Sequence, residues 1–553
     1  MTKAAFPQVR VREVAEAVTD GLIALGVERA YALGGREISP MIDALGRSAI
    51  AVIQARHESG AGFMAIGDWM VSDGLTAIAA TTGPGLANVI NALMAARMTR
   101  MPLILLTPLT PPIETNRLGI QATGPSGFTL SELHAAGRLF DYVAHVHTAD
   151  QLPAVFGRIA RGLAHDPGFT AHIALPTTLQ AEATSVQIAV PPCAPSKRAP
   201  SPTQVEQIRT IIDDERVAVW VGFGARPHAE LVRRFVAKAQ LPVLASPRAL
   251  GIADGCATFV GVTGNGGHEL VFEELARYGV ERVLVLGSRL GEATSGWDAR
   301  LVPTGGLIHV DHDHRAFGIG FPQAPTIAVE ADIGLTLRAL LDGPLARRGF
   351  RRRRPPRGLF AAPTPQADRL HPVEMLEVLQ RVVVDAGLPY FADASSAMFW
   401  SANRLEFPVA DRYFSEQAWG SMGFAGAAAV GAAAALRTPV FALCGDASMH
   451  MQDEINTAVK YDLPTIWGVM SNGGPSIVRF GMEAHGRFDH DGWYPDTDFA
   501  AVARAKGARA TRVTSASQLE QALTLALETR SPHLIDIVLD PSVAPPIGAR
   551  ARR

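Results

Sequence analysis

Short apolar runs alternate along the chain with longer stretches rich in Ala and Leu. Apolar runs of this length are typical of strands, and the longer stretches are typical of helices. We expect strands within residues 49–56, 75–83, 101–109, 169–176, 217–224, 241–246, 282–288, 307–311, 388–393, 438–446, 464–472 and 533–540. Because these runs are apolar almost throughout and alternate with helices, they predict an α/β fold with parallel sheets covered on both faces.

Two proline-rich segments interrupt this pattern. They are residues 190–202 (VPPCAPSKRAPSP) and 347–366 (RRGFRRRRPPRGLFAAPTPQ). Proline at this density blocks helices and strand pairing, so we expect extended linkers. The sequence therefore predicts three doubly wound parallel-sheet domains, which the linkers separate into residues 1–189, 203–346 and 367–553.

Composition narrows the class of protein. The 553 residues carry a net charge of −2, with 48% hydrophobic and 19% charged residues, as in soluble globular proteins. The three cysteines lie far apart, which argues against a disulfide framework or a zinc site and fits a reducing compartment. No segment resembles a signal peptide or a membrane span. We expect a cytoplasmic protein that binds neither nucleic acid nor membranes.

Polar residues follow two of the predicted strands in the last domain. One strand ends in Gly445-Asp446-Ala447-Ser448, and the next ends in Ser471-Asn472-Gly473-Gly474. A tight turn at a helix N-terminus offers N–H groups to a diphosphate, and one carboxylate can hold a cation there. If the two strands are neighbours, Asp446 and Asn472 meet at one edge. A carboxylate, an amide oxygen, a backbone carbonyl, water and two diphosphate oxygens form the octahedral oxygen shell that Mg²⁺ prefers.

This pattern resembles the metal-binding signature of thiamine-diphosphate (ThDP) dependent enzymes, Gly-Asp-Gly followed, after a spacer of similar length, by Asn-Asn. Ala447 and Ser471 depart from it, but the metal ligands map to Asp446, Asn472 and the carbonyl of Gly474. The resemblance implies Mg²⁺ at these three residues. It implies a ThDP diphosphate held by the same turn, with the contacts Gly445, Asp446, Ala447, Ser448, Asn472 and Gly474.

A second match lies far upstream. Arg56-His57-Glu58-Ser59-Gly60 follows the strand at 49–56 and resembles the segment that carries the family's activating glutamate. The resemblance implies that Glu58 contacts N1′ of the aminopyrimidine and favours the imino tautomer, which deprotonates C2 of the thiazolium to an ylide. His57 is a candidate proton shuttle, with a structural role as the alternative. Downstream, Gly83-Pro84-Gly85 with Asn88 also occurs in acetolactate-synthase-like proteins and has the plain role of a tight turn.

Two further segments of the last domain match the same family. In Trp419-Gly420-Ser421-Met422, the resemblance implies that the Gly420 carbonyl accepts a hydrogen bond from the 4′-amino group and that Met422 separates the two cofactor rings. In the loop after residue 392, Ser395 and Ser396 are implied diphosphate contacts. The resemblance covers the whole chain in the order pyrimidine-binding, central and pyrophosphate-binding domain. Some relatives bind FAD or ADP in the central domain, and both stay open here.

The resemblance also bears on the reaction. Decarboxylases of the pyruvate-decarboxylase type carry a His pair, an Asp and a Glu at three places in the site. This chain has Phe128-Thr129 in place of the His pair, Gly35 in place of the Asp and Val478 in place of the Glu. Gly34-Gly35 match the Gly pair of acetolactate synthases. Where those enzymes carry Phe-Gln-Glu, this chain has Phe128-Thr129-Leu130 and so departs from them at the last two positions. We therefore expect an acetolactate-synthase-like carboligase: the ylide adds to a 2-keto acid such as pyruvate, CO₂ is lost, and the enamine adds to a second carbonyl compound.

Two alternatives remain for the reaction. One is a lyase or hydrolase acting on an acyloin, diketone or 2-hydroxyacyl substrate. The other is a non-catalytic ThDP-fold binding or regulatory subunit, against which the retention of Glu58, Asp446 and Asn472 argues.

Four residues are candidates for the substrate side of the site: Gly35, Arg36, Thr129 and His485. Arg36 can clamp a substrate carboxylate through two hydrogen bonds, with a surface ion pair as the alternative. In the family, ThDP lies between the pyrimidine-binding domain of one subunit and the pyrophosphate-binding domain of another. The resemblance therefore implies a homodimer or homotetramer.

Overall fold

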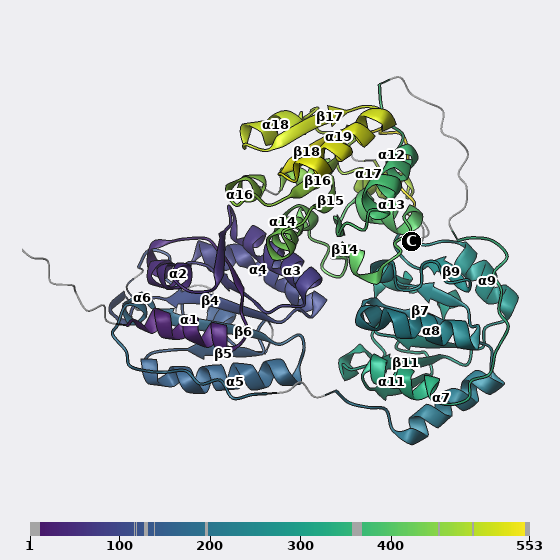
Figure 1. The fold of residues 1–553 in the computed structure, drawn as a ribbon, viewed down its shortest axis with the longest axis horizontal. Coiled ribbons are helices and arrows are strands. Elements are labelled where there is room, and N and C mark those ends of the chain that lie inside the picture. The colour runs from purple at the N-terminus through teal and green to yellow at the C-terminus, as the bar shows by residue number, and fades with distance from the viewer. Residues whose placement is uncertain are drawn as a thin grey trace, which may run out of the picture. The chain divides into compact units, whose positions relative to one another are not determined.

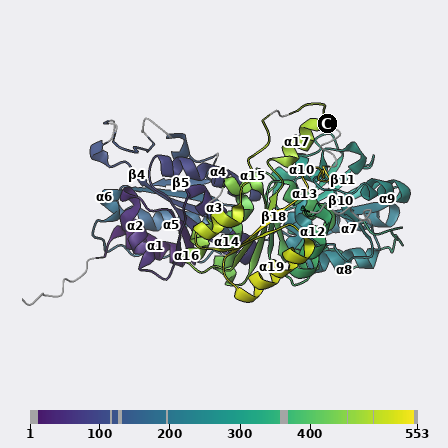
Figure 2. The ribbon, with the colours of Figure 1, turned by 90° about the horizontal axis from the view of Figure 1, so that it is seen from above.

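The fold consists of three six-stranded sheets in which every strand pair is parallel. The computed structural model describes residues 12–114, 117, 119–125, 131–137, 139–193, 197–356, 368–451, 454–488 and 491–547. Figures 1 and 2 show the three sheets in turn along the chain, from purple through teal to yellow, each with helices packed against it. The predicted α/β fold with parallel, helix-covered sheets is confirmed.

The first sheet has the strand order β2-β1-β3-β4-β6-β5. Its strands are β1 (Arg29–Ala32), β2 (Ala51–Gln54), β3 (Thr76–Ala79), β4 (Leu103–Leu109), β5 (Tyr142–His145) and β6 (Thr170–Pro176). Side chains alternate between faces along a strand, so Ala77 and Ala79 join the core under α1 (Val14–Ala24), α2 (Ser39–Gly46) and α5 (Leu152–His165). Tyr31 points to the other face, where its hydroxyl donates to Asp68 of α3 (Glu58–Ser72). Helix α4 (Pro84–Thr99) packs beside α3, and the short α6 (Thr177–Gln180) follows β6.

The second sheet has the order β12-β11-β10-β7-β8-β9. Its strands are β7 (Val217–Val221), β8 (Val243–Ala245), β9 (Phe259–Val262), β10 (Arg282–Leu286), β11 (Leu307–Asp311) and β12 (Thr326–Glu330). Alternate residues of β7 face two different cores. Val217 and Val219 meet α7 (Pro202–Asp214), α8 (Ala229–Ala239) and α11 (Ile333–Leu341), whereas Ala218 and Trp220 meet α9 (Leu270–Tyr278). The short α10 (Glu292–Ser295) follows β10.

The third sheet has the order β14-β13-β15-β16-β18-β17. Its strands are β13 (Tyr390–Ala392), β14 (Tyr413–Ser415), β15 (Val440–Gly445), β16 (Thr465–Ser471), β17 (Arg509–Val513) and β18 (His533–Val538). Ile466 and Met470 of β16 join the core with α12 (Pro372–Leu379), α13 (Ser396–Arg404) and α19 (Ala516–Thr529). Trp467 points to the opposite face, where its Nε1 donates to the Gly426 carbonyl of α14 (Phe424–Leu436) at 2.9 Å. The shorter helices are α15 (Asp446–His450), α16 (Ile455–Lys460), α17 (Ser476–Glu483) and α18 (Phe499–Ala505).

The first and third sheets have the same strand order, counted along the chain within each sheet. In both, the chain reverses its direction of winding between the first and third strands, which lie side by side. Open α/β sheets bind ligands at the carboxyl ends of the strands at such a point. In the third sheet this point is occupied by the loop after β13, which begins with Asp393, and by the start of α15 at Asp446, directly after β15. In the first sheet it is occupied by the loops after β1 and β3.

The chain forms two compact units. One covers the chain up to residue 196 together with Val430–Leu436, and the other covers Lys197–Ala429 and the chain from Arg437 onwards. The second and third sheets thus belong to one unit, and hydrogen bonds join them: His268 Nε2 contacts the Asn403 carbonyl at 2.9 Å, and Asn403 Nδ2 donates to the Gly266 carbonyl at 3.1 Å. The boundaries of the three predicted domains stay a prediction.

Where the structure describes the two predicted linkers, at 190–193, 197–202 and 347–356, they have no helix or strand except at Pro202, which is the first residue of α7. The arginine run beginning at Arg351 lies along the second sheet, since Arg352 donates to the Phe259 carbonyl and Arg354 pairs with Glu273. Across the described residues, no helix combines the length and the apolar character needed to cross a lipid bilayer.

The buried Trp467 allows a test of the third sheet. It is 1% exposed, so Trp467→Ala removes a large core side chain and one hydrogen bond. We expect the free energy of unfolding to fall by about 3–5 kcal/mol, measured by urea denaturation. Trp297 is 49% exposed and serves as the control, since Trp297→Ala should cost about 0.5 kcal/mol or less. Equal losses in the two variants would contradict this packing.

Candidate active site

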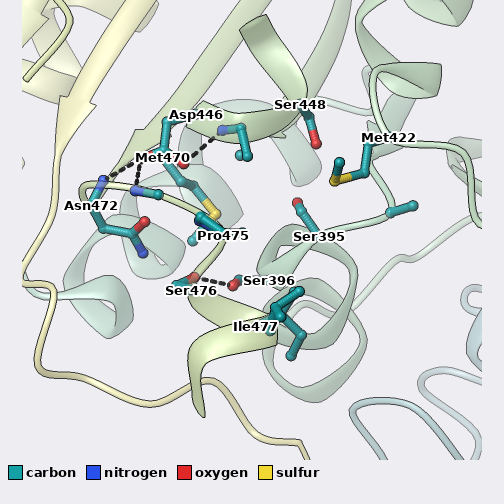
Figure 3. A pocket seen from close by; sticks show the side chains of 15 residues that line it. Ser395, Ser396, Met422, Asp446, Ser448, Met470, Asn472, Pro475, Ser476 and Ile477 are labelled. Carbon is teal, nitrogen blue, oxygen red and sulfur yellow. Dashed lines mark hydrogen bonds between the residues drawn. The ribbon is translucent and has the colours of Figure 1, made fainter. Parts of the chain in front are cut away.

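Asp446 organises a pocket at the carboxyl ends of β15 and β16. Its Oδ2 accepts hydrogen bonds from the backbone N–H groups of Asn472, Gly473 and Gly474 at 3.1, 2.9 and 2.9 Å. Its Oδ1 accepts from the Ala447 N–H at 2.7 Å. Figure 3 shows Asp446 and Asn472 at one side of the pocket, with dashed lines from the carboxylate to its backbone donors. The side chain of Asp446 therefore ties the two strand ends together.

Burial gives this carboxylate an unusual electrostatic environment. Asp446 is 5% exposed, and desolvation raises its pKa, although the backbone donors partly oppose this shift. Asn472 is 9% exposed and lies beside it. One carboxylate and one amide are oxygen ligands of the kind Mg²⁺ selects. In the described residues no group of three or more His, Cys, Asp or Glu is placed to hold a metal.

Hydroxyl groups line the other side of the same pocket. Ser395 lies in the loop after β13, Ser396 begins α13 and Ser448 lies on α15, and Figure 3 shows the hydroxyls of Ser395 and Ser448 facing the space beside Met422. A Cβ at Gly445 would lie 3.2 Å from Cβ and 3.3 Å from Oγ of Ser395. It would also lie 3.9 Å from Oγ of Ser448, so the missing side chain leaves space beside both hydroxyls. Ser396 Oγ and Ser476 Oγ form a hydrogen bond of 2.6 Å that joins the first residue of α13 to the first residue of α17.

The loop carrying Gly420 and Met422 approaches the pocket from β14. Gly420 has a φ of +77°, which a residue with a side chain adopts only with strain. Met422 is 37% exposed and lines the pocket. The fully buried Asp393 fixes the end of this loop, because its carboxylate accepts from the N–H groups of Gly423 and Ala425 at 3.1 and 2.8 Å. Asp393 is thus a structural partner of the site that sequence reasoning did not single out.

Ser471, one of the two departures from the family signature, has a clear contact. Its hydroxyl donates a short hydrogen bond to Asp536 of the neighbouring strand β18. Asp536 also lies 3.2 Å from Arg512 Nη1, and burial raises the pKa of its carboxyl. Ser471 therefore anchors the strand end that carries Asn472, and the departure leaves the side chain of Asn472 in the pocket.

In the other unit, Glu58 lies in the first turn of α3 and is 6% exposed. Asn88 Nδ2, on α4, donates to Oε2 of Glu58 at 3.0 Å, and Ser59 Oγ donates to the Asn88 carbonyl at 2.6 Å. The other oxygen is approached through Gly85, where a Cβ would lie only 3.3 Å from Oε1. One carboxyl oxygen is therefore engaged by Asn88, and the absence of a side chain at Gly85 leaves space beside the other.

The other predicted site residues lie in several environments. His57 is the N-cap of α3, with its Nδ1 accepting from the Ser59 N–H, so it has a structural role whether or not it moves protons. Gly35 packs against Thr81, where a Cβ would come within 2.7 Å. Arg36 is 77% exposed and pairs with Glu37. His485 is exposed in the turn after α17 and is not among the pocket-lining residues. Thr129 lies outside the described residues.

Three profile models of domain families match this chain. The N-terminal thiamine pyrophosphate (TPP) binding domain of thiamine pyrophosphate enzymes matches residues 12–125. Their central domain matches 206–340, and their C-terminal TPP binding domain matches 393–537. The chain belongs to the thiamine pyrophosphate enzyme family. Its two TPP-binding domains contain Glu58 and the Asp446 pocket, respectively.

Relatives along the whole length include acetolactate synthases. The chain is 26% identical to the acetolactate synthase isozyme 1 large subunit of Escherichia coli, over 95% of this chain and 94% of that protein. It is 25% identical to the acetolactate synthase large subunit of Corynebacterium glutamicum, over 97% and 88%. Among solved structures, benzoylformate decarboxylase from Polynucleobacter necessarius has a TM-score of 0.83 at 18% identity, covering 97% and 100% of the two chains. At this identity the structural likeness shows the fold alone.

The contact between Asn88 and Glu58 yields a prediction for this enzyme. Asn88→Ala leaves Oε2 of Glu58 without its donor, and a lost hydrogen bond to a charged or catalytic group costs about 1.5–3 kcal/mol. We expect turnover at saturating ThDP to fall about 10- to 100-fold. The matched control is Asn91→Ala, an exposed asparagine on the same helix, which should keep at least half of the activity. Wild-type turnover in Asn88→Ala would contradict the role.

The raised pKa of Asp446 predicts how cofactor binding depends on pH. If Mg²⁺ binds at Asp446, it needs the ionised carboxylate, so the Mg²⁺ concentration required for ThDP binding should rise as pH falls through the pKa of Asp446. Because burial raises this pKa, the loss should begin at a higher pH than for an ordinary aspartate. In the metal-free protein the free energy of unfolding should instead rise as pH falls through the pKa of Asp446, because protonation removes the cost of burying the charged carboxylate. Calorimetric titrations between pH 5 and 8 check this, and a flat profile would contradict it.

Proposed function

We propose that this enzyme is a ThDP- and Mg²⁺-dependent carboligase. It removes CO₂ from a 2-keto acid such as pyruvate and joins the remaining acyl carbon to a second carbonyl compound. The coarser statement, a ThDP-dependent transferase or lyase, follows from the family. The carboligase assignment is supported by the composition of the pocket and by the acetolactate synthases among the relatives.

The observation that carries the proposal is the scarcity of proton donors in the pocket. Among the described residues that line it, Asp446 is the one titratable side chain, and it is engaged by four backbone N–H groups. The apolar part of the lining includes Met422, Ile477 and the 49% exposed Val478. Without a nearby acid, protonation of the decarboxylated carbon is slow, which leaves time for a second carbonyl compound to react.

The residues present fit the proposed cofactor. Asp446, Asn472 and the Gly474 carbonyl would hold Mg²⁺, and the Ser395, Ser396 and Ser448 hydroxyls would contact the diphosphate with the backbone of Gly445, whereas the Ala447 N–H is already engaged by Asp446. When bound, ThDP supplies a carbon nucleophile that accepts the electrons released with CO₂. Glu58 would hold a proton at the pyrimidine ring, Asn88 would orient Glu58, and Met422 would fill the space between the cofactor rings.

We further propose that the active enzyme is a homodimer or homotetramer in the cytoplasm. Large apolar side chains are exposed in the third-sheet domain: Trp419, Met422, Val478, Trp493 and Tyr494. Such side chains suit a partner surface. The cytoplasmic assignment is supported by the three free cysteines, Cys193, Cys256 and Cys444. Activity that persists in a monomer at low nanomolar concentration would contradict the proposed assembly.

The test is to incubate the enzyme with ThDP, Mg²⁺ and pyruvate, alone and with a set of aldehydes and 2-keto acids as acceptors. We expect CO₂ release to rise with an acceptor and to match the ligated product one to one. Free acetaldehyde in equal amount to CO₂ with every acceptor would favour a simple decarboxylase instead. Cleavage of acyloins or diketones without ligation would favour the lyase or hydrolase alternative, and no turnover would favour the non-catalytic one.

Val478 offers a sharper test of the carrying observation. Val478→Glu places a titratable group in the apolar part of the pocket, and we expect the share of free aldehyde among the products to rise about tenfold. Val478→Gln is the matched control, because it adds similar bulk and polarity without an acid. If both variants change the product ratio equally, proton supply does not decide the outcome.

A further inference from the structure

Glu416 is a fully buried carboxylate directly after β14, at the start of the loop that carries Gly420 and Met422. It is 0% exposed, and charged side chains are almost never buried to this extent without partners. It does not line the pocket, so it has no part in holding the metal or the diphosphate. Its partners therefore need a separate explanation.

Those partners are the successive N–H groups of its own loop. Oε1 of Glu416 accepts from the Ala418 and Trp419 N–H groups, both at 2.8 Å. Oε2 accepts from Gly420 N at 2.7 Å and from Ser421 N at 3.4 Å. The loop thus wraps around the carboxylate, as consecutive backbone N–H groups do around a bound anion.

This arrangement fixes the direction of the loop carbonyls. In a trans peptide the C=O points opposite to the N–H of the next residue, and the described residues contain no cis peptide bond. Since the Ser421 N–H faces Glu416, the Gly420 carbonyl points away from it. The positive φ of Gly420 continues this turn, and Asp393 holds the far end through Gly423.

The charge of Glu416 also meets the neighbouring sheet of the same unit. Arg248, in the turn after β8, interacts electrostatically with Glu416, and its guanidinium stacks over the Phe223 ring at 4.0 Å. Burial lowers the pKa of Arg248 to about 10, so it remains charged near neutral pH. A half-buried cation from the second sheet thus acts electrostatically on the buried anion that shapes the loop.

We propose that Glu416 is a positioning residue that orients the Gly420 carbonyl and Met422 toward ThDP, with Arg248 providing charge compensation from the second sheet. This inference rests on the proposed roles of Gly420 and Met422. It adds to them a buried group that never touches the cofactor. The role requires the negative charge and the reach of Glu416, and not merely its volume.

The test compares Glu416→Gln with wild type. The amide keeps the volume, but its NH₂ faces backbone N–H groups, so some of the charge-assisted hydrogen bonds are lost. We expect the ThDP dissociation constant, measured by calorimetry with saturating Mg²⁺, to rise about 10- to 100-fold. At saturating ThDP, kcat should fall at least about tenfold while KM for the 2-keto acid changes less than about threefold.

Glu274→Gln is the matched control for lost stability. Glu274 is a 2% exposed carboxylate on α9 that pairs with Arg277. This variant should lower Tm and leave the ThDP dissociation constant unchanged. If Glu416→Gln does not fold, Glu416→Asp decides instead, because it keeps the charge but is one methylene too short to reach every N–H. Its ThDP affinity should fall in the same direction by a smaller factor.

A folded Glu416→Gln that binds ThDP with wild-type affinity would overturn the proposal, as would an equal loss of affinity in Glu274→Gln. If Glu416→Asp is the variant measured, wild-type affinity in it has the same meaning. The binding titration is independent of the reaction. If the wild-type enzyme binds ThDP but converts no 2-keto acid, the carboligase assignment fails while the affinities still decide the role of Glu416.

Discussion

The site depends on the hydrogen bonds between the Asp446 carboxylate and the backbone of residues 472–474. Parallel pairing brings the ends of β15 and β16 side by side, but it does not fix the loops that follow them. The carboxylate does this at the cost of its own burial, which its raised pKa reflects. The N–H groups around it partly offset that cost, and a divalent cation would offset more of it.

Buried carboxylates recur around the pocket in the same role. Asp393, Glu416 and Asp446 each accept hydrogen bonds from backbone N–H groups of loops that contribute to the site. The consequence is that these N–H groups are already engaged and cannot bind a diphosphate. Serine hydroxyls, other backbone groups and the metal are left to bind it. The protein thus uses fixed negative charge for shape, and the proposed Mg²⁺ would make the pocket attractive for an anionic cofactor.

The sequence predicted much of this arrangement, because the decisive features are local. All twelve expected strands are present, and the spacing from Asp446 to Asn472 follows from one strand, one helical stretch and the next strand. Five of the six unpredicted strands, β5, β9, β12, β14 and β17, lie at sheet edges. Edge strands have one neighbour and carry weaker patterns, as in the half-exposed β12. The sixth, β1, is four residues long and begins with arginine.

Contacts between residues that are far apart along the chain could not be predicted from the sequence. The hydrogen bond from Asn88 to Glu58 joins residues that lie thirty positions apart on two different helices, and nothing in the local sequence pattern indicates it. The same holds for the hydrogen bond of Asp393 with the Gly423 N–H and for the electrostatic interaction of Arg248 with Glu416, which link residues far apart in the sequence. The ring of N–H groups around Glu416 is local, yet it depends on the path of the loop, which residue types alone do not specify.

The proposed metal site has a consequence for how the enzyme retains its cofactor. In the proposed site the protein would contribute only three oxygen ligands, so the ion and the cofactor would each bind weakly without the other, and both should leave together. Purification in a chelating buffer would then yield apoenzyme even when thiamine is abundant. In the cell, the fraction of active enzyme would follow the product of the free Mg²⁺ and ThDP concentrations, so a shortage of either would leave the enzyme inactive.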